Sequence, residues 1–147
     1  MRIFCTGGAG YIGSVLVPEL LAAGHSVHVL DSLLHGASGL AACCAHPSFE
    51  FTRGDARDAR LVRELVRGAD TVVPLAALVG APLCARYPDD AVTVNQHAIE
   101  TLAAMLSKDQ LIVYPNTTSG YGSTDGTPVT EDSPMTPISL YGRTKCR

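Results

Sequence analysis

The chain has 147 residues, 46% hydrophobic and 17% charged, which is enough for one domain with a buried core. Its net charge of −3 gives no indication of a nucleic-acid or membrane partner, and no apolar run is long enough to span a bilayer. No secretory signal is recognised, the five cysteines form no CxxC pair, and the five histidines are scattered. We therefore expect a cytoplasmic protein with reduced thiols and without a metal site.

The first half of the sequence alternates between short apolar runs and one amphipathic helix. In chain order the pattern predicts a strand over 3–5, a helix over 11–23, a strand over 27–30, an irregular stretch over 32–47 and a strand over 49–52. The helix over 11–23 ends before Gly24, as a glycine C-cap would require. Its predicted buried stripe consists of Ile12, Val15, Leu16, Val17 and Leu20.

The second half continues the alternation. It predicts a helix over 58–67, a strand over 71–75, a helix over 89–107, a strand over 111–114, a loop over 116–137 and a last helix from Ser139. The helix over 58–67 should bury Leu61, Val62 and Leu65, and its arginines, interrupted by acids, favour a solvated face over a binding patch. Pro74 lacks a backbone donor and should mark the last paired position of its strand.

Alternating strands and helices with nearly continuous apolar strands predict an α/β fold, a parallel sheet covered on both faces. Right-handed crossovers with a glycine turn after the first strand give a Rossmann-type doubly wound sheet in the order 3-2-1-4-5.

The segment TGGAGYIG, Thr6 to Gly13, lies between a predicted strand and a predicted helix. Gly7 and Gly10 allow a tight turn and a close approach of backbone amides to a pyrophosphate, while Gly13 allows close helix–strand packing. The segment therefore predicts a dinucleotide site, with a ligand-free glycine turn as the alternative. The candidate cofactor-binding residues here are Gly7, Gly10, Tyr11, Ile12 and Gly13.

Asp31 ends the second predicted strand and is followed by Ser32, which we include as a cofactor contact. A carboxylate at this position accepts hydrogen bonds from ribose hydroxyls and repels a 2′-phosphate. No Lys or Arg lies in 32–36 to offset that charge, so the cofactor expected is NAD rather than NADP. The alternative is a solvating residue at a strand end.

Tyr141 and Lys145 are spaced to share one face of the last predicted helix. With five tyrosines and two lysines, an accidental Tyr-x-x-x-Lys match is expected only about 0.07 times. An ammonium one turn away stabilises phenolate, which can take the hydroxyl proton of an alcohol while hydride leaves for a nicotinamide. An ordinary surface contact is the alternative.

The motifs occur in an order that resembles extended short-chain dehydrogenases/reductases and, more narrowly, the NAD-dependent sugar-nucleotide epimerase/dehydratase family. They are GGAGYIG, Asp31, GD at 54–55, LAALVG at 75–80, VN at 94–95, TTSGYG at 117–122 and YGRTK at 141–145. The resemblance covers the whole chain.

The resemblance implies roles for further residues. Asp55 and Ala56 would contact adenine, and Asn95 would help to hold the cofactor loop. Thr117 would bind the substrate oxygen, Tyr141 would exchange its proton, and Lys145 would also bond the nicotinamide ribose. The apolar loop residues that would line the cofactor are Leu75, Ala76 and Ala77.

Two departures from the family pattern bear on the reaction. Thr118 and Ser119 stand where family dehydratases carry Asp-Glu, which argues against 4,6-dehydration by the usual groups. Pro74 replaces a frequent histidine. We therefore expect a sugar-nucleotide epimerase, with a dehydratase, decarboxylase or reductase of the same family as the alternative and a non-catalytic NAD sensor as a third reading.

Family members run to roughly twice this length, so the resemblance predicts that residues 1–147 are the NAD-binding N-terminal portion of a longer enzyme. The second portion would supply most of the nucleotide-sugar pocket. The resemblance also implies a homodimer, formed through the helix over 89–107 and the helix from Ser139.

Overall fold

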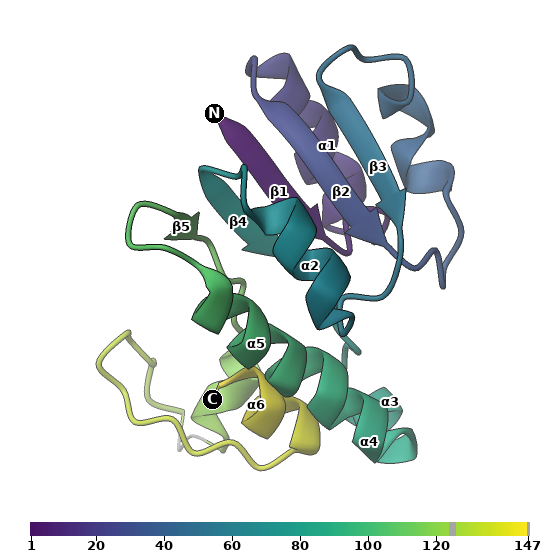
Figure 1. Cartoon of the computed structure of the whole chain (residues 1–147). Coiled ribbons are helices and arrows are strands. Elements are labelled where there is room, and N and C mark those ends of the chain that lie inside the picture. The colour runs from purple at the N-terminus through teal and green to yellow at the C-terminus, as the bar shows by residue number, and fades with distance from the viewer. Residues whose placement is uncertain (124–125, 147) are drawn as a thin grey trace. The chain divides into compact units, whose positions relative to one another are not determined.

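The computed structural model describes residues 1–123 and 126–146. They divide into two compact units, one formed by 1–76 with 98–114 and the other by 77–97 with 115–147. Each unit has its own elements (Figure 1). In the described residues no helix is long and apolar enough to cross a membrane.

The first unit holds a parallel sheet in the order β3-β2-β1-β4-β5, which confirms the predicted topology. Its strands are β1 (Arg2–Thr6), β2 (Ser26–Asp31), β3 (Phe49–Arg53), β4 (Thr71–Pro74) and β5 (Leu111–Ile112). Pro74 is the last paired residue of β4, opposite Thr6, as its missing donor predicts. The last strand is shorter than expected, although the Val113 amide still donates to the Val72 carbonyl.

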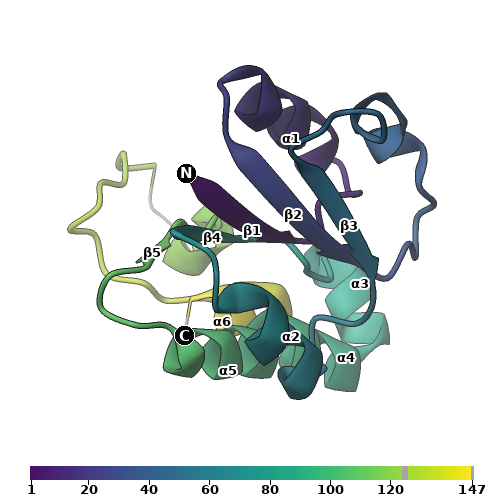
Figure 2. The ribbon, with the colours of Figure 1, turned by 45° about the horizontal axis from the view of Figure 1, so that its top comes forward.

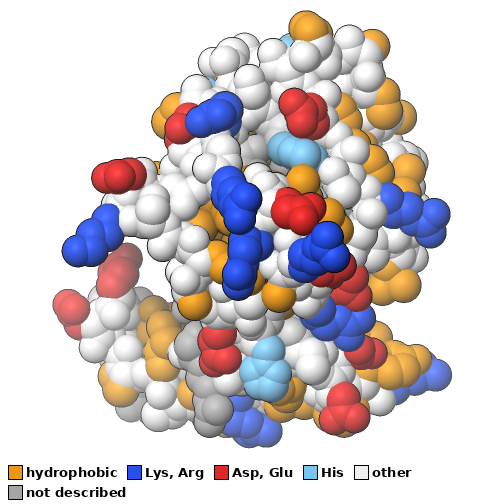
Figure 3. All heavy atoms as spheres, in the orientation of Figure 1, with side chains coloured by type: hydrophobic (Ala, Val, Ile, Leu, Met, Phe, Trp, Pro, Cys, Tyr) orange, Lys and Arg blue, Asp and Glu red, His pale blue; other side chains and the backbone are white. Residues whose placement is uncertain are grey.

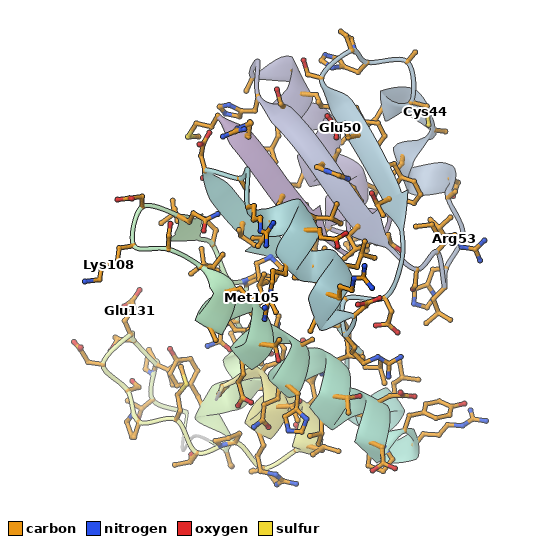
Figure 4. All side chains as sticks on the ribbon, in the orientation of Figure 1. Cys44, Glu50, Arg53, Met105, Lys108 and Glu131 are labelled. Carbon is orange, nitrogen blue, oxygen red and sulfur yellow. The ribbon has the colours of Figure 1, made fainter. Side chains whose placement is uncertain are left out.

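Helices cover both faces of this sheet (Figures 1 and 2). Alternate residues of β1 point to opposite faces: Ile3 and Cys5 to one, Phe4 to the other. The first face packs against α1 (Gly13–Ala22) and the short 3₁₀ helix η1 (Ser38–Cys43). The second packs against α2 (Ala59–Val66) and α5 (Ala98–Met105), with Met105 on the inner side of α5 (Figure 4).

The buried stripes of the two early helices differ from the predicted ones. In α1 the fully buried apolar residues are Val17 and Leu21, whereas Ile12 and Val15 are 56% and 67% exposed. In α2 the buried residues are Val62 and Val66, with Leu61 and Leu65 only half-buried. The periodicity of a sequence predicts that a helix has an apolar stripe. It does not predict which side of that stripe packs against the sheet.

Helix α2 starts as its sequence demands. The Asp58 carboxylate accepts hydrogen bonds from the amides of Arg60 and Leu61, which is a side-chain N-cap. Its outer face carries arginines interleaved with acids (Figure 3), and Arg60 pairs with Glu64 at 3.5 Å one turn on. This arrangement fits the solvated face that the sequence favours.

The second unit is helical. It contains α3 (Ala81–Arg86), α4 (Pro88–Val92), the π-helical segment η2 (Thr93–His97), the 3₁₀ turn η3 (Thr118–Tyr121) and α6 (Leu140–Lys145). Along the chain α4, η2 and α5 are continuous, so the helix predicted over 89–107 exists over 88–105 with a π segment inside it. The helix α3 is absent from the sequence prediction. Helix α6 packs against α3, α4 and η2.

Candidate functional site

The glycine turn of the first unit is shaped by close backbone contacts. Gly7 has a φ of +74°, and a Cβ added there would lie 2.4 Å from the Ala76 nitrogen. A Cβ at Gly13 would lie 2.2 Å from the Gly8 carbonyl oxygen. Both positions require glycine, because backbone atoms cannot give way. These contacts set the turn at the carboxyl end of β1, the edge where parallel sheets bind dinucleotides.

Gly10 differs from these two glycines. A Cβ there would meet only the Gly7 carbonyl oxygen, at 3.2 Å, and the Gly10 carbonyl accepts from the Ser14 amide at the start of α1. Packing within the protein therefore requires glycine less strictly at position 10 than at positions 7 and 13. A bare backbone next to a helix N-terminus is what a pyrophosphate needs, so the turn fits the diphosphate of a dinucleotide.

Asp31 closes the same turn. One carboxylate oxygen accepts from the Ala9 amide at 2.9 Å and the other from the Leu33 amide at 2.7 Å. These bonds fix the carboxylate at the carboxyl end of β2 and leave lone pairs on both oxygens. An acid held beside the glycine turn fits a dinucleotide whose ribose has two hydroxyls. Ser32 follows on the exposed side.

Asp55 lies one residue after Gly54, whose amide donates to the Asp31 carbonyl at 3.0 Å. Its carboxylate is paired with the guanidinium of Arg57, at 2.6 Å from Nη2. The side-chain hydrogen bonds from Arg57 lower the pKa of Asp55, so it stays ionised. The pairing of Arg57 with Asp55 was not predicted from the sequence. The available signal was a basic residue two positions after an acid. Ala56 between them is half-buried.

The loop after β4 is tied to β1. The Leu75 amide donates to the Thr6 carbonyl at 2.8 Å, and the Ala76 amide lies 3.4 Å from the Thr6 hydroxyl. Leu75 and Ala76 are half-buried. Thr6, a residue that sequence reasoning missed, thus joins the glycine turn to the predicted cofactor loop. By contrast, Tyr11 is 96% exposed and Ile12 is 56% exposed, so neither side chain is held by its own unit.

Ala77, Asn95, Thr117, Tyr141 and Lys145 belong to the second unit. Asn95 is 1% exposed and grips the backbone of Leu78: its Oδ1 accepts from the Leu78 amide at 2.8 Å and its Nδ2 donates to the Leu78 carbonyl at 2.9 Å. This pair of hydrogen bonds holds the loop directly after Ala77. The role expected of Asn95 thus has a physical basis in that unit.

Thr117 stands at the start of η3, where its hydroxyl oxygen accepts from the Ser119 amide at 3.2 Å. Helix α6, which carries Tyr141 and Lys145, packs on this turn. A Cβ on Gly142 would lie 2.7 Å from the Ser119 carbonyl oxygen, so the two segments meet backbone to backbone. The close packing brings the Thr117 turn and the Tyr–Lys helix together.

Lys145 is a buried cation, with 5% of its surface exposed. Desolvation lowers the pKa of its ammonium. Ser139 caps the start of helix α6, and its hydroxyl accepts from the Gly142 amide at 3.0 Å. Tyr141 is half-buried one turn before Lys145 on this helix.

Other groups in the described residues do not form a competing site. All five cysteines are free, and burial together with the charge of Asp31 raises the pKa of Cys5 to about 12. In residues 1–123 and 126–146 no three His, Cys, Asp or Glu side chains gather as metal ligands do. A hollow of about 680 Å³ lies between α2 and α5 beside Asp70 and Gln110, at the amino ends of β4 and β5. That edge is opposite to the glycine turn.

The fold and these residues define a Rossmann-type dinucleotide-binding protein with a Tyr-x-x-x-Lys helix. More particularly, the chain belongs to the NAD dependent epimerase/dehydratase family, whose model matches residues 3–147. The glycine turn, Asp31 and the Tyr-x-x-x-Lys pair are features of extended short-chain dehydrogenases/reductases, and they fit this assignment.

Several of its relatives are sugar-nucleotide enzymes. The chain is 36% identical to a UDP-glucose 4-epimerase of Lactobacillus helveticus over 152 aligned positions, which are 99% of this chain and 44% of that protein. A 4-epimerase for UDP-Glc/GlcNAc from Campylobacter jejuni has a TM-score of 0.89 at 29% identity, covering 98% of this chain and 45% of that one.

A dehydratase is equally similar in structure. The dTDP-glucose 4,6-dehydratase DesIV of Streptomyces venezuelae, solved with NAD bound, has a TM-score of 0.90 at 35% identity and covers 99% of this chain and 48% of that one. The chain therefore spans about half the length of the relatives it matches.

Proposed function

We propose that residues 1–147 are the NAD-binding portion of a sugar-nucleotide epimerase, with Thr117, Tyr141 and Lys145 as catalytic residues. The observation that carries the proposal is the packing of α6 on the Thr117 turn, where a Cβ on Gly142 would lie 2.7 Å from the Ser119 oxygen. That packing sets a hydroxyl, a phenol and an ammonium on two segments in contact.

The proposed cofactor is NAD, and the glycine turn and Asp31 would hold its pyrophosphate and adenosine ribose. Asp55, kept ionised by Arg57, would accept from the adenine amino group. Leu75, Ala76 and Ala77 would line the cofactor, Asn95 would hold their loop, and Lys145 would bond the nicotinamide ribose. Tyr11, Ile12 and Ser32 complete the proposed contacts.

The chemistry of the chain's own residues follows from their donors and acceptors. Because the Thr117 oxygen accepts from Ser119, its hydroxyl proton is left to bond a sugar oxygen. Tyr141 as phenolate takes the proton of that sugar hydroxyl, and the Lys145 ammonium stabilises the phenolate. Bound NAD would supply the redox chemistry as the acceptor and then the donor of a hydride. Once the keto sugar has presented its other face for the return of the hydride, Tyr141 gives the proton back to the same sugar oxygen, so the carbon is inverted and no net oxidation occurs.

A dehydratase of the same family is the second candidate, favoured by the likeness to DesIV at 35% identity. Elimination of water needs an acid and a base beside the substrate. The two positions after Thr117 hold Thr118 and Ser119, neither of which is acidic. This difference favours epimerisation.

One experiment distinguishes the epimerase from the dehydratase. The complete polypeptide that carries this chain is incubated with UDP- and dTDP-hexoses, and the products are identified by NMR. An epimerase converts one hexose into its epimer until equilibrium is reached. Accumulation of NADH or of a stable keto sugar would contradict the proposal, and a 4-keto-6-deoxy product would establish the dehydratase.

A further inference from the structure

Thr144 lies on α6 between Tyr141 and Lys145 and is only 3% exposed. Its hydroxyl is 3.0 Å from the Leu140 carbonyl oxygen and 3.1 Å from that of Tyr141, one turn back on the same helix. A threonine inside a helix commonly donates in this way without any outside partner. The carbonyls of the helix therefore provide an acceptor for the hydroxyl hydrogen of Thr144. They provide no donor for its oxygen, which can accept a further hydrogen bond.

The acceptor faces Asn95. The Asn95 amide nitrogen donates one hydrogen to the Leu78 carbonyl at 2.9 Å, and it lies 3.4 Å from the Thr144 oxygen. The contact is long, so its bond is at the weak end of the range. Asn95 and Thr144 are both nearly inaccessible to water, at 1% and 3% exposed, which makes an unpaired group here costly. Cys84 adds only a weaker sulfur contact at 3.8 Å.

These bonds form one chain inside the second unit: the Leu78 backbone, the Asn95 amide, the Thr144 hydroxyl and the backbone of α6. Helix α6 packs against α3, α4 and η2, and these contacts set its rotation about its own axis. Asn95 itself sits in a π segment, the kind of irregularity that is frequent at functional sites.

We propose that Thr144 is a positioning residue, whose hydroxyl ties α6 to Asn95 and so fixes where Tyr141 and Lys145 stand relative to the loop at Leu78. The proposal rests on the proposed function, because it needs Tyr141 to be the proton-transferring group. The proposed role depends on the hydroxyl, because a valine would fill the same volume but could not accept a hydrogen bond from Asn95.

The test uses the complete polypeptide with Thr144→Val, Thr144→Ser and, as a matched control, Thr71→Val. Thr71 is a buried threonine of β4, in the other unit, and valine suits a strand. Turnover and KM are measured across pH, together with NAD binding and unfolding by denaturant. Thr144→Val should lower kcat roughly three- to tenfold, as expected for one buried hydrogen bond, with NAD affinity within about twofold of the parent.

The pH profile separates positioning from stability. In Thr144→Val the acid limb of the kcat profile should move to higher pH, because a displaced ammonium supports phenolate less well. Thr144→Ser should restore both kcat and the limb. A Thr144→Val profile that superimposes on that of Thr71→Val overturns the proposal, even if the variant is less stable.

The two levels of failure can be told apart. If the parent epimerises and the Thr144 variants match the control, the positioning role is wrong and the function stands. If the parent binds NAD but converts no sugar nucleotide, the function is wrong and the positioning role falls with it.

Discussion

The Tyr141 phenol carries the proton in the proposed reaction, and it lies half-buried one helical turn before Lys145. Tyr141→Phe removes only the oxygen, so the packing of the ring is kept. We expect turnover to fall by about 10²–10⁴-fold, the usual loss of a general acid–base group, with NAD still bound. Steady-state rates and NAD titration measure both effects.

This substitution also tests whether the protein is an enzyme at all. A non-catalytic NAD sensor would keep its NAD-dependent response in Tyr141→Phe, because the cofactor contacts in the glycine turn remain. Unchanged turnover in the variant would exclude Tyr141 as the base. Tyr87→Phe, at the C-terminal end of α3 and 44% exposed, controls for the loss of a tyrosine hydroxyl away from the Thr117 turn.

Lys145 sets catalysis against stability. Desolvation lowers the pKa of its ammonium in the folded protein below the value in the unfolded chain, which means that burying the charge destabilises the folded state. We expect Lys145→Met to be more stable than the parent at pH 7, although inactive. Denaturant unfolding and turnover check the two halves of this prediction.

The pH dependence of this difference has a definite sign. Below the lowered pKa, both folded and unfolded chains carry the charged lysine and the full cost applies. As pH rises from there through 10.5, the folded protein loses its proton first, so the parent gains stability relative to Lys145→Met. The difference in stability between the two proteins should therefore shrink as the pH rises toward 10.5, and a difference that grows would contradict the burial argument.

At the scale of elements, the approach of α6 to the Thr117 turn depends on Gly142. An alanine there would put its Cβ 2.7 Å from the Ser119 oxygen and 3.0 Å from the Pro137 Cβ. The gain in helix propensity is about 1 kcal/mol, whereas overpacking costs about 1–3 kcal/mol. We expect Gly142→Ala to lose stability by about 1 kcal/mol and to lose most of its turnover, measured by unfolding and kinetics.

Gly68→Ala is the matched control for that change. A Cβ on Gly68 meets only the end of the flexible Arg2 side chain, at 3.3 Å, which can move aside. Stability and activity should be nearly unchanged in this variant. If Gly142→Ala behaves like it, backbone contact between α6 and the turn is not what holds the catalytic segments together.

The sheet and the glycine turn were predictable because each follows from local pattern. The β strands are apolar runs, and their order follows from crossover handedness and the turn after β1. The π segment was not predictable, because Asn95 owes its place to Leu78, a residue distant in sequence. The same reason hid the Thr144 contact. In α1, composition indicated an apolar stripe but not that Val15 would be 67% exposed.

At the scale of the whole molecule, the free edge of the sheet is apolar. Its last strand, β5, is two residues long, and Leu111 and Val113 around it are 60% and 50% exposed. Exposed apolar edge strands favour pairing with another chain. Following the resemblance to the family, we propose that a second portion of a longer polypeptide supplies further strands and most of the sugar-nucleotide pocket. The chain spans 43–48% of the length of these relatives.

The 147-residue chain expressed alone should therefore bind NAD at least about tenfold more weakly than the complete polypeptide and convert no sugar nucleotide. The glycine turn and Asp31 can still contact the cofactor, but fewer groups order the loop and α6. Calorimetric titration with NAD and NMR of UDP-hexose mixtures, on both forms at equal concentration, measure the difference. Equal affinity would mean that residues 1–147 already contain the whole cofactor site, and turnover by the short form would remove the need for a second portion.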